Sequence, residues 1–148
     1  MQITNQEKLG KLGEELVAKI FNGQLSENKY DSTKDMLVEG KTVEVKTQNR
    51  HPNGSFTVRA DHKVNFQKCM SVDHLIFVEY DHSDNIKIYE CDERENYNSV
   101  TTRAYPPETM SRTMICWPIS KMNHIKTVID PVLAEQMRSL SNAKAFRK

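Results

Sequence analysis

The sequence lacks any apolar stretch of membrane-spanning length, and its N-terminus lacks the pattern of a secretory signal. Its three cysteines lie far apart and form no C-x-x-C pair, and its five histidines lack the spacing of zinc ligands. Charge of one sign is not in excess either, because 21 Lys and Arg face 20 Asp and Glu. These absences argue against a membrane span, a disulfide framework and structural zinc. We expect a cytoplasmic protein whose thiols act as small core residues, and a net charge of +1 neither demands nor excludes a polyanionic partner.

The length and composition fit a globular chain with a real core. The chain has 148 residues, of which 37% are hydrophobic and 28% are charged. We therefore expect one domain spanning residues 1–148.

The stretch Lys34–Gln48 organises the rest of the chain. It holds two short apolar runs, Met36–Val38 and the pair Val43 and Val45, on either side of Gly40. Runs of this kind around a glycine predict a tight antiparallel hairpin. Because side chains alternate along a strand, the two valines share the core face. The opposite face then carries Thr42, Glu44, Lys46 and Gln48.

The register of this hairpin decides what lies opposite Asp35. A turn at Glu39–Gly40 pairs Asp35 with Glu44, whereas a turn at Gly40–Lys41 pairs it with Lys46. In both registers the valines stay buried, and two carboxylates meet one ammonium on a rigid sheet. A hard divalent cation with a nearby amine requires such a set. The alternative is a solvated strand face of mixed charges, which is the commoner meaning of an isolated E-x-K.

Periodicity and turn residues predict the remaining elements. A helix capped by Thr4 or Asn5 should run to Asn22, with Gly10 and Gly13 allowing close approach to a sheet. The strongest strand pattern is His74–Tyr80, whose continuous apolar run predicts burial on both faces. The other predictions are a strand at 56–58, a helix at 61–70, a strand at 86–89, no assignment for 92–113, a strand at 114–117, a turn and short helix at 118–127, and a helix from Asp130.

Taken in order, these elements resemble the PD-(D/E)XK nuclease superfamily, and most nearly its archaeal Holliday junction resolvases and restriction-type nucleases. The resemblance rests on Gly10–Glu14 in the first helix, Asp35 at the head of a strand, Glu44-Val45-Lys46, and the buried strand 74–80. It implies a mixed α/β (α+β) fold with a restriction-endonuclease-like core. That core is a helix, a three-stranded sheet, a helix and a strand within about residues 1–91. Residues 92–148 would form an extension with a C-terminal strand and helix.

The resemblance also implies roles for these residues. Asp35 and Glu44 would hold Mg²⁺ or Mn²⁺, with the Val45 carbonyl as a further oxygen ligand. Lys46 would orient or deprotonate the attacking water, or stabilise charge on the phosphate. Glu14 would complete the catalytic and metal-binding set at its edge, unless it is an exposed helix glutamate. Glu15 is the alternative to it.

Residues following the E-x-K strand would contact nucleic acid. Gln48 continues the face of the site, and a run of basic residues comes next. Each is more often a solvated charge, but together they would line a groove that follows the phosphate backbone. The members of this predicted groove are Gln48, Arg50, His51, Arg59, Lys63 and Lys68, with Gln48, Arg50, Arg59 and Lys63 as the main nucleic-acid contacts.

The resulting prediction is a Mg²⁺-dependent DNA endonuclease, either structure-specific like a resolvase or of restriction type. The alternatives are a nuclease acting on RNA, a non-cleaving nucleic-acid-binding module on the same fold, and a small protein–protein adaptor or inhibitor. Relatives that cut both strands usually pair, so a homodimer is a further expectation. No membrane partner is expected.

Overall fold

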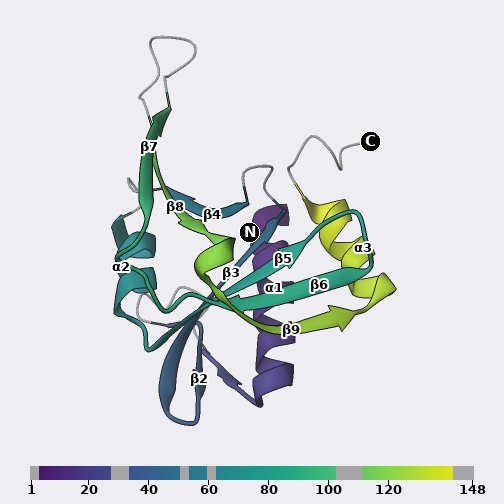
Figure 1. Ribbon diagram of the computed structural model, residues 1–148. Helices are drawn as coiled ribbons and strands as arrows, with labels where there is room; N and C mark the ends of the chain where they lie inside the picture. The colour runs from purple at the N-terminus through teal and green to yellow at the C-terminus, as the bar shows by residue number, and fades with distance from the viewer. Residues whose placement is uncertain (1–3, 28–33, 51–53, 60–62, 103–111, 142–148) are drawn as a thin grey trace.

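A computed structural model describes residues 4–27, 34–50, 54–59, 63–102 and 112–141 (Figure 1). None of the helices in these ranges is long and apolar enough to cross a membrane. In chain order the elements are α1 (Asn5–Phe21), β1 (Gln24–Leu25), β2 (Met36–Val38), β3 (Lys41–Asn49), β4 (Ser55–Arg59), α2 (Lys63–Ser71), β5 (His74–Tyr80), β6 (Asn85–Glu90), β7 (Asn98–Thr102), β8 (Arg112–Pro118), the 3₁₀ turn η1 (Ile119–Lys121), β9 (Asn123–Ile129) and α3 (Pro131–Leu140).

The strands form two sheets within the described residues. The larger has six strands in the order β1-β2-β3-β5-β6-β9, and the smaller has three in the order β4-β8-β7. Strands β3 and β5 run parallel, and every other pairing of described strands is antiparallel. With three helices, this is an α+β mixed fold.

The larger sheet is covered on both faces by separate hydrophobic clusters. On one face Val45 and Val78 pack with Val17 of α1 and Met137 of α3. On the other face Phe77 stacks on Phe56 of β4, with ring centroids 4.3 Å apart. The predicted strand 74–80 is therefore confirmed, together with its burial on both faces.

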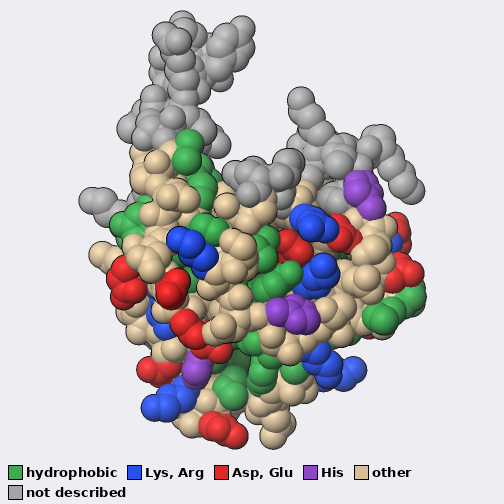
Figure 2. Space-filling view, viewed as in Figure 1, with side chains coloured by type: hydrophobic (Ala, Val, Ile, Leu, Met, Phe, Trp, Pro, Cys, Tyr) green, Lys and Arg blue, Asp and Glu red, His purple; other side chains and the backbone are tan. Residues whose placement is uncertain are grey.

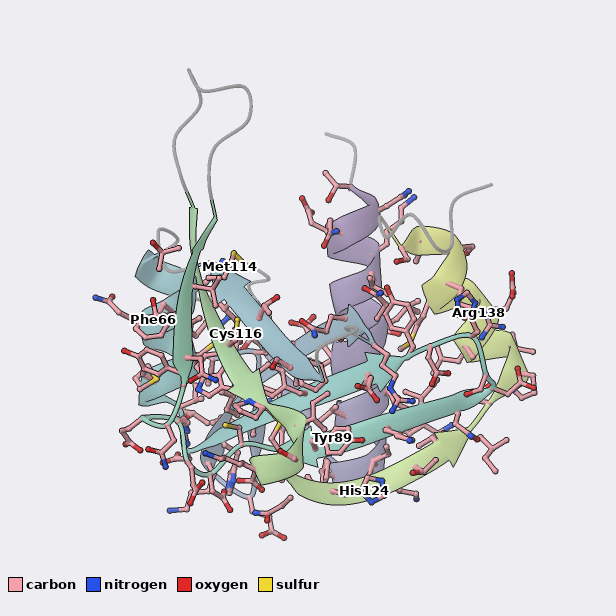
Figure 3. All side chains as sticks on the ribbon, turned by 45° about the horizontal axis from the view of Figure 1, so that its top comes forward. Phe66, Tyr89, Met114, Cys116, His124 and Arg138 are labelled. Carbon is pink, nitrogen blue, oxygen red and sulfur yellow. The ribbon has the colours of Figure 1, made fainter. Side chains whose placement is uncertain are left out.

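The second cluster also joins α2 to the smaller sheet. Phe66 of α2 lies beside β7 and beside β8, the strand that carries Met114 and Cys116 (Figure 3). Its ring lies 6.5 Å from that of Trp117, centroid to centroid. Because all three cysteines are buried and free, the prediction that they act as core thiols is confirmed.

Helix α1 begins and ends where its sequence indicates. The Thr4 side chain accepts a hydrogen bond from the Glu7 N–H at 3.1 Å, which satisfies a donor left free by the first turn. At the other end Asn22 adopts a left-handed conformation with φ of 55°. The predicted helix from Thr4 or Asn5 to Asn22 is confirmed, with Thr4 as its cap.

The two glycines of α1 differ in their surroundings. A Cβ added at Gly13 would lie 1.8 Å from Thr47 Oγ1 and 3.0 Å from Thr47 Cβ, so α1 touches β3 there. A Cβ at Gly10 would have nothing within 4 Å. Close approach is confirmed for Gly13 and wrong for Gly10.

This difference predicts opposite effects of alanine. Gly13→Ala should lower the free energy of unfolding by about 1–3 kcal/mol, because rotating Thr47 cannot remove the contact with its Cβ. Gly10→Ala should raise it by about 0.5–1 kcal/mol through helix propensity alone. Urea denaturation of both variants measures the difference. Equal effects at the two positions would contradict close packing of α1 on β3.

The hairpin β2–β3 turns at Glu39–Gly40. Both turn residues have positive φ, 50° and 78°, as a two-residue hairpin turn requires. The register pairs Met36 with Val43 and Val38 with Lys41, so the alternative turn at Gly40–Lys41 is wrong. Asp35 therefore comes opposite Glu44.

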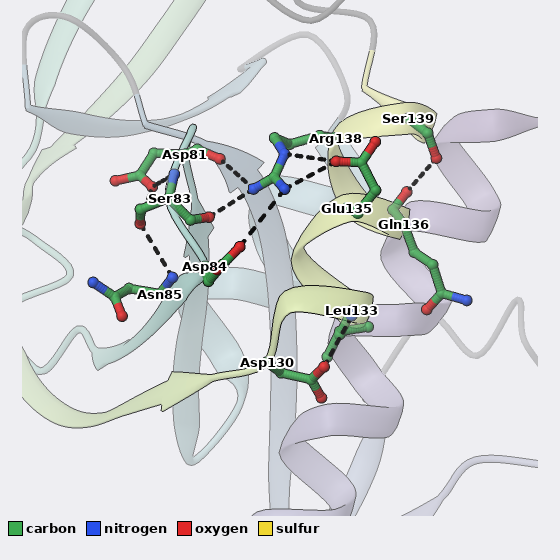
Figure 4. A network of polar contacts seen from close by, with 10 residues as sticks. All are labelled: Asp81, Ser83, Asp84, Asn85, Asp130, Leu133, Glu135, Gln136, Arg138 and Ser139. Carbon is green, nitrogen blue, oxygen red and sulfur yellow. Dashed lines mark hydrogen bonds and ion pairs between the residues drawn. The ribbon is translucent and has the colours of Figure 1, made fainter.

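Helix α3 is docked by polar contacts to the turn between β5 and β6 (Figure 4). Arg138 donates hydrogen bonds to the carbonyls of Asp81 and Ser83, the latter at 2.6 Å. At the start of the helix Asp130 accepts a hydrogen bond from the Leu133 N–H at 3.0 Å. The predicted C-terminal helix is confirmed.

The chain beyond Cys91 differs most from the sequence prediction. The strand expected at 114–117 is present as β8, but β7 fell in the unassigned stretch. The short helix expected within 118–127 is wrong, because η1 is a single turn and β9 follows it. A three-stranded core sheet is also too small. Strand β9 is mostly exposed at the sheet edge, so it has little of the apolar pattern that marks a strand.

Candidate active site

Four side chains from three segments meet at the open end of the β2–β3 hairpin. The pair Met36 and Val43 is the last of the β2–β3 pairing at this end, and Asp35 is the residue just before Met36. Glu44 and Lys46 project from the face of β3 opposite the buried valines. The fourth side chain is Lys68, from the last turn of α2.

Asp35 is held in place by the edge of β3. Its backbone N–H donates to the Val43 carbonyl at 2.8 Å. Its Oδ2 accepts a hydrogen bond from the Val45 N–H at 2.8 Å, so the carboxylate continues the ladder where β2 stops. Its Oδ1 accepts from Lys68 Nζ at 2.7 Å.

Glu44 is buried, with 1% of its surface exposed, and each oxygen faces a different lysine. Oε2 lies 2.9 Å from Lys46 Nζ and Oε1 lies 3.2 Å from Lys68 Nζ. The second contact is an ion pair without hydrogen-bond geometry. Within the described part of the chain, Oε1 thus remains a buried acceptor that receives no hydrogen bond. Such an atom is costly unless another cation or donor satisfies it.

The two lysines differ in exposure. The Lys46 side chain is 27% exposed, whereas the Lys68 side chain is only 9% exposed. Burial lowers the pKa of both, but the carboxylates of Glu44 and Asp35 outweigh it and raise both pKa values. Both lysines therefore stay protonated at neutral pH. Burial raises the pKa of the neighbouring Cys69 thiol to about 12, so it supplies no thiolate nucleophile.

Glu14 belongs to the same electrostatic unit. Burial and the neighbouring Asp35 raise its pKa to about 7. The approach of α1 at Gly13 brings it there, whereas Glu15 is exposed on the helix. The structure favours Glu14 over Glu15 as the helix acid of the site.

The pKa values of Asp35 and Glu44 are shifted in opposite directions. Burial, and then the hydrogen bond and charge of Asp35, raise the pKa of Glu44 to about 8. Burial also opposes ionisation of Asp35, but hydrogen bonds from Glu44, Lys68 and the Val45 N–H hold its pKa below its usual value. Two acids this close keep one proton between them more readily than they both ionise.

These shifts predict how the stability of the metal-free protein depends on pH. A carboxyl whose folded pKa is raised stabilises the fold below its ordinary pKa and loses that contribution as pH rises through the folded value. Glu14 and Glu44 place this loss between their ordinary 4.5 and about 7 and 8. In EDTA, Tm should therefore fall by a few °C, on the order of 5 °C, from about pH 5 to pH 8.

The amide of Glu44→Gln imitates the protonated acid, so this variant should show a shallower decline in thermal melts followed by circular dichroism. Glu15→Gln, one position from Glu14 and exposed, should retain the full decline. A flat wild-type profile would contradict the raised pKa values.

The carboxylates of the site fit a hard cation only if other oxygen ligands complete the set. Within the described residues, no three His, Cys, Asp or Glu side chains form a metal-binding group by themselves. Asp35 and Glu44 offer carboxylate oxygens, and Glu44 Oε1 is buried without a hydrogen bond. Oxygen ligands of this kind suit Mg²⁺ or Mn²⁺, provided that backbone or water oxygens complete the set.

Residues beyond the site hold α2, and so Lys68, in position. Arg94 donates hydrogen bonds to the carbonyls of Cys69, Met70 and Val72 at the end of α2, and to that of Asp73 at 2.8 Å. A cation there also suits the negative end of the helix dipole. Trp117 of β8 donates to the Arg94 carbonyl at 2.9 Å. The smaller sheet thus supports α2 through Arg94.

The predicted nucleic-acid contacts have different outcomes. The amide of Gln48 bridges to β4, donating to the Ser55 carbonyl at 3.0 Å and accepting from the Thr57 N–H at 3.2 Å. Arg50 is exposed, 3.9 Å from Asp81. His51 lies outside the described residues, as do the side chains of Arg59 and Lys63. Figure 2 shows acidic and basic side chains interspersed over the face in view, in keeping with the net charge of +1.

The contribution of Lys68 to the site is the main feature that the sequence prediction missed. We expected it in the groove, yet it lies between Asp35 and Glu44. One signal was present: Lys68 is four residues before the buried Val72, whose N–H donates to the Lys68 carbonyl, so both lie on the packed side of the helix.

Comparison with known proteins adds no family to this description. No protein-family model matches the chain, and no curated protein matches it.

Proposed function

We propose that this protein is a metal-dependent nuclease that hydrolyses phosphodiester bonds in DNA. The observation that carries the proposal is the convergence of Asp35, Glu44 and Lys46 on the open end of a rigid hairpin, with Asp35 fixed by the Val45 N–H. A solvated strand face would leave these charges exposed and separate. Instead Glu44 is buried and the Asp35 side chain beside it is only 10% exposed, at an energetic cost that a structural role does not require.

The order of the elements supports a restriction-endonuclease-like core of the PD-(D/E)XK type. A helix bearing Glu14 precedes the hairpin bearing Asp35 and Glu44, and α2 then leads to β5, parallel to β3. The extra strands β6 and β9 extend the sheet on the far side of β5, away from the hairpin. This assignment rests on architecture and the resemblance of the motifs.

The acids would hold Mg²⁺ or Mn²⁺ through Asp35, Glu44 and the Val45 carbonyl, with Glu14 at the edge. When bound, such an ion supplies charge neutralisation at the phosphate. The Lys46 side chain is 27% exposed, and its ammonium lies 2.9 Å from Glu44 Oε2. Its raised pKa keeps it protonated, so we assign it stabilisation of negative charge on the phosphate rather than proton abstraction from water.

Two parts of the proposal extend to partners and location. DNA is the proposed substrate, and a homodimer would allow both strands to be cut. A cytoplasmic location agrees with the buried, unpaired thiols. The second candidate is a nuclease acting on RNA through the same site, because the acids and Lys46 would address a phosphodiester of either nucleic acid.

The test is incubation of the purified protein with labelled linear duplex, four-way junction, single-stranded DNA and single-stranded RNA. Each substrate is assayed with Mg²⁺, Mn²⁺, Ca²⁺ and EDTA. Cleavage of DNA that requires Mg²⁺ or Mn²⁺ is the expected result. Cleavage of RNA alone would replace DNA by RNA as the substrate. Binding without cleavage would instead favour a nucleic-acid-binding module, and neither binding nor cleavage would overturn the proposal.

A further inference from the structure

Each of the two acids has one oxygen paired with Lys68 and one paired with another group. Asp35 Oδ2 is bound by the Val45 N–H, and its Oδ1 by Lys68 at 2.7 Å. Glu44 Oε2 is bound by Lys46, and its Oε1 faces Lys68 at 3.2 Å. The ammonium of Lys68 therefore occupies both oxygens that remain for any other cation.

We propose that Lys68 is a built-in counter-cation that holds the metal-facing oxygens of Asp35 and Glu44 and withdraws when a divalent ion binds there. This inference rests on the proposed function, because it concerns the same metal site. It adds a residue from α2 to the site and a competition between that residue and the metal.

Both cations cannot use these oxygens together. Mg²⁺ binds carboxylate oxygens at about 2.0–2.1 Å and Ca²⁺ at about 2.3–2.6 Å. An ammonium kept at its present distances from Asp35 Oδ1 and Glu44 Oε1 would then lie within a few ångströms of a double positive charge, in a buried place where repulsion is poorly screened. Metal binding thus requires Lys68 to move.

The structure allows this movement at little cost. Lys68 carries its charge on a flexible four-carbon stem, so the ammonium can move while the helix stays in place. The end of α2 is fixed by Arg94, whose guanidinium donates hydrogen bonds to the backbone carbonyls of Cys69, Met70, Val72 and Asp73. Once released, the ammonium would be free to meet an anionic phosphate at the same site.

The counter-cation also offsets charge within the site itself. Two acids this close resist ionising together, and a cation between them offsets the negative charge that they carry. Lys68 supplies that cation from within the chain. It therefore stabilises the two acids and weakens metal binding through the same two contacts.

The direct test compares Lys68→Met with Lys46→Met by calorimetric titration of Ca²⁺ and Mn²⁺ at constant pH, without nucleic acid. Both variants remove one positive charge beside Glu44, but only Lys68→Met frees an oxygen of each acid, Asp35 Oδ1 and Glu44 Oε1. Lys68→Met should bind both ions on the order of tenfold more tightly than wild type, and Lys46→Met clearly less so. Equal tightening would assign the effect to net charge and overturn the inference.

The outcomes also separate this inference from the proposed function. If wild type binds the ions and Lys68→Met binds them no more tightly, the counter-cation role is wrong while the metal site stands. If neither wild type nor Lys68→Met binds them, both proposals fail.

A second measurement uses the wild-type chain, so it does not depend on the folding of a variant. An amine-reactive reagent followed by mass spectrometry reports the reactivity of each lysine with and without Ca²⁺. Lys68 should become several-fold more reactive when Ca²⁺ binds, while the exposed Lys41 in the hairpin should not change. A Lys68 equally protected in both states would contradict its displacement.

Discussion

Replacing Asp35 by Asn should lower the rate of DNA cleavage by about a thousandfold, the scale of a lost electrostatic contact with the reacting group. The asparagine carbonyl can still accept the hydrogen bond from the Val45 N–H, so the backbone geometry is kept. Lys68 keeps Glu44 as a counter-charge, so no buried ammonium is left alone. What disappears is the charge that would hold the metal. Single-turnover cleavage in Mg²⁺ measures the rate, and circular dichroism checks the fold.

Asp84→Asn is the matched control for this prediction. Asp84 is an exposed acid in the turn before β6, and its only described ion pair, with Arg138, spans 3.9 Å. The same chemical change there should leave the rate within about twofold, as expected of a surface substitution away from the site. A folded Asp35→Asn variant that cleaves at the wild-type rate would remove Asp35 from the site.

The parts of the fold that the sequence predicted are those that depend on local patterns. Strand alternation alone identified the buried Val43 and Val45, and the capping signals at Thr4 and Asn22 marked both ends of α1. The hairpin register needed one more fact. Only the turn at Glu39–Gly40 brings Asp35 opposite Glu44, and the positive φ at Glu39 decides it, since the sequence alone left two turns open.

The smaller sheet was missed because its pairings are distant in sequence. β4 pairs with β8 from Ser55 with Pro118 to Arg59 with Met114, far beyond the range of any periodic pattern. The sequence predicted two of its strands, at 56–58 and 114–117, from apolar residues such as the buried Val58 and Ile115, but it did not reveal their pairing. The residues after 91 have a structural role: through Trp117 and Arg94 they support the helix that carries Lys68.

The site was predictable to the extent that it lies on one hairpin. Asp35, Glu44 and Lys46 follow from alternation and pairing within fifteen residues of chain, from Lys34 to Gln48. Lys68 does not, because the direction of a helical side chain depends on how its helix packs, and α2 is oriented by contacts with distant strands. Glu14 lies between these cases. Gly13 indicated a close contact, but only the structure identifies Thr47 as its partner.

The remaining prediction distinguishes the two lysines of the hairpin. Lys46→Met should lower the cleavage rate by about a hundredfold, the scale of general acid–base or electrostatic catalysis. Lys41→Met, five residues earlier on the same strand and exposed, should change it little. Only Lys46 is braced by a buried acid that directs its ammonium, at 2.9 Å from Glu44 Oε2. Rates under single-turnover conditions separate the chemical step from product release.

A third variant, Lys46→Arg, separates the two chemical roles of this residue. Arginine keeps the positive charge but has too high a pKa to accept a proton near neutral pH. Because the raised pKa of Lys46 keeps it charged, we expect Lys46→Arg to retain more activity than Lys46→Met, with a rate that does not follow titration of the side chain. If Lys46→Arg is as inactive as Lys46→Met while still binding Ca²⁺ and DNA, proton transfer from water to a neutral Lys46 becomes the better account. If all three lysine variants match wild type, Lys46 is only a surface charge.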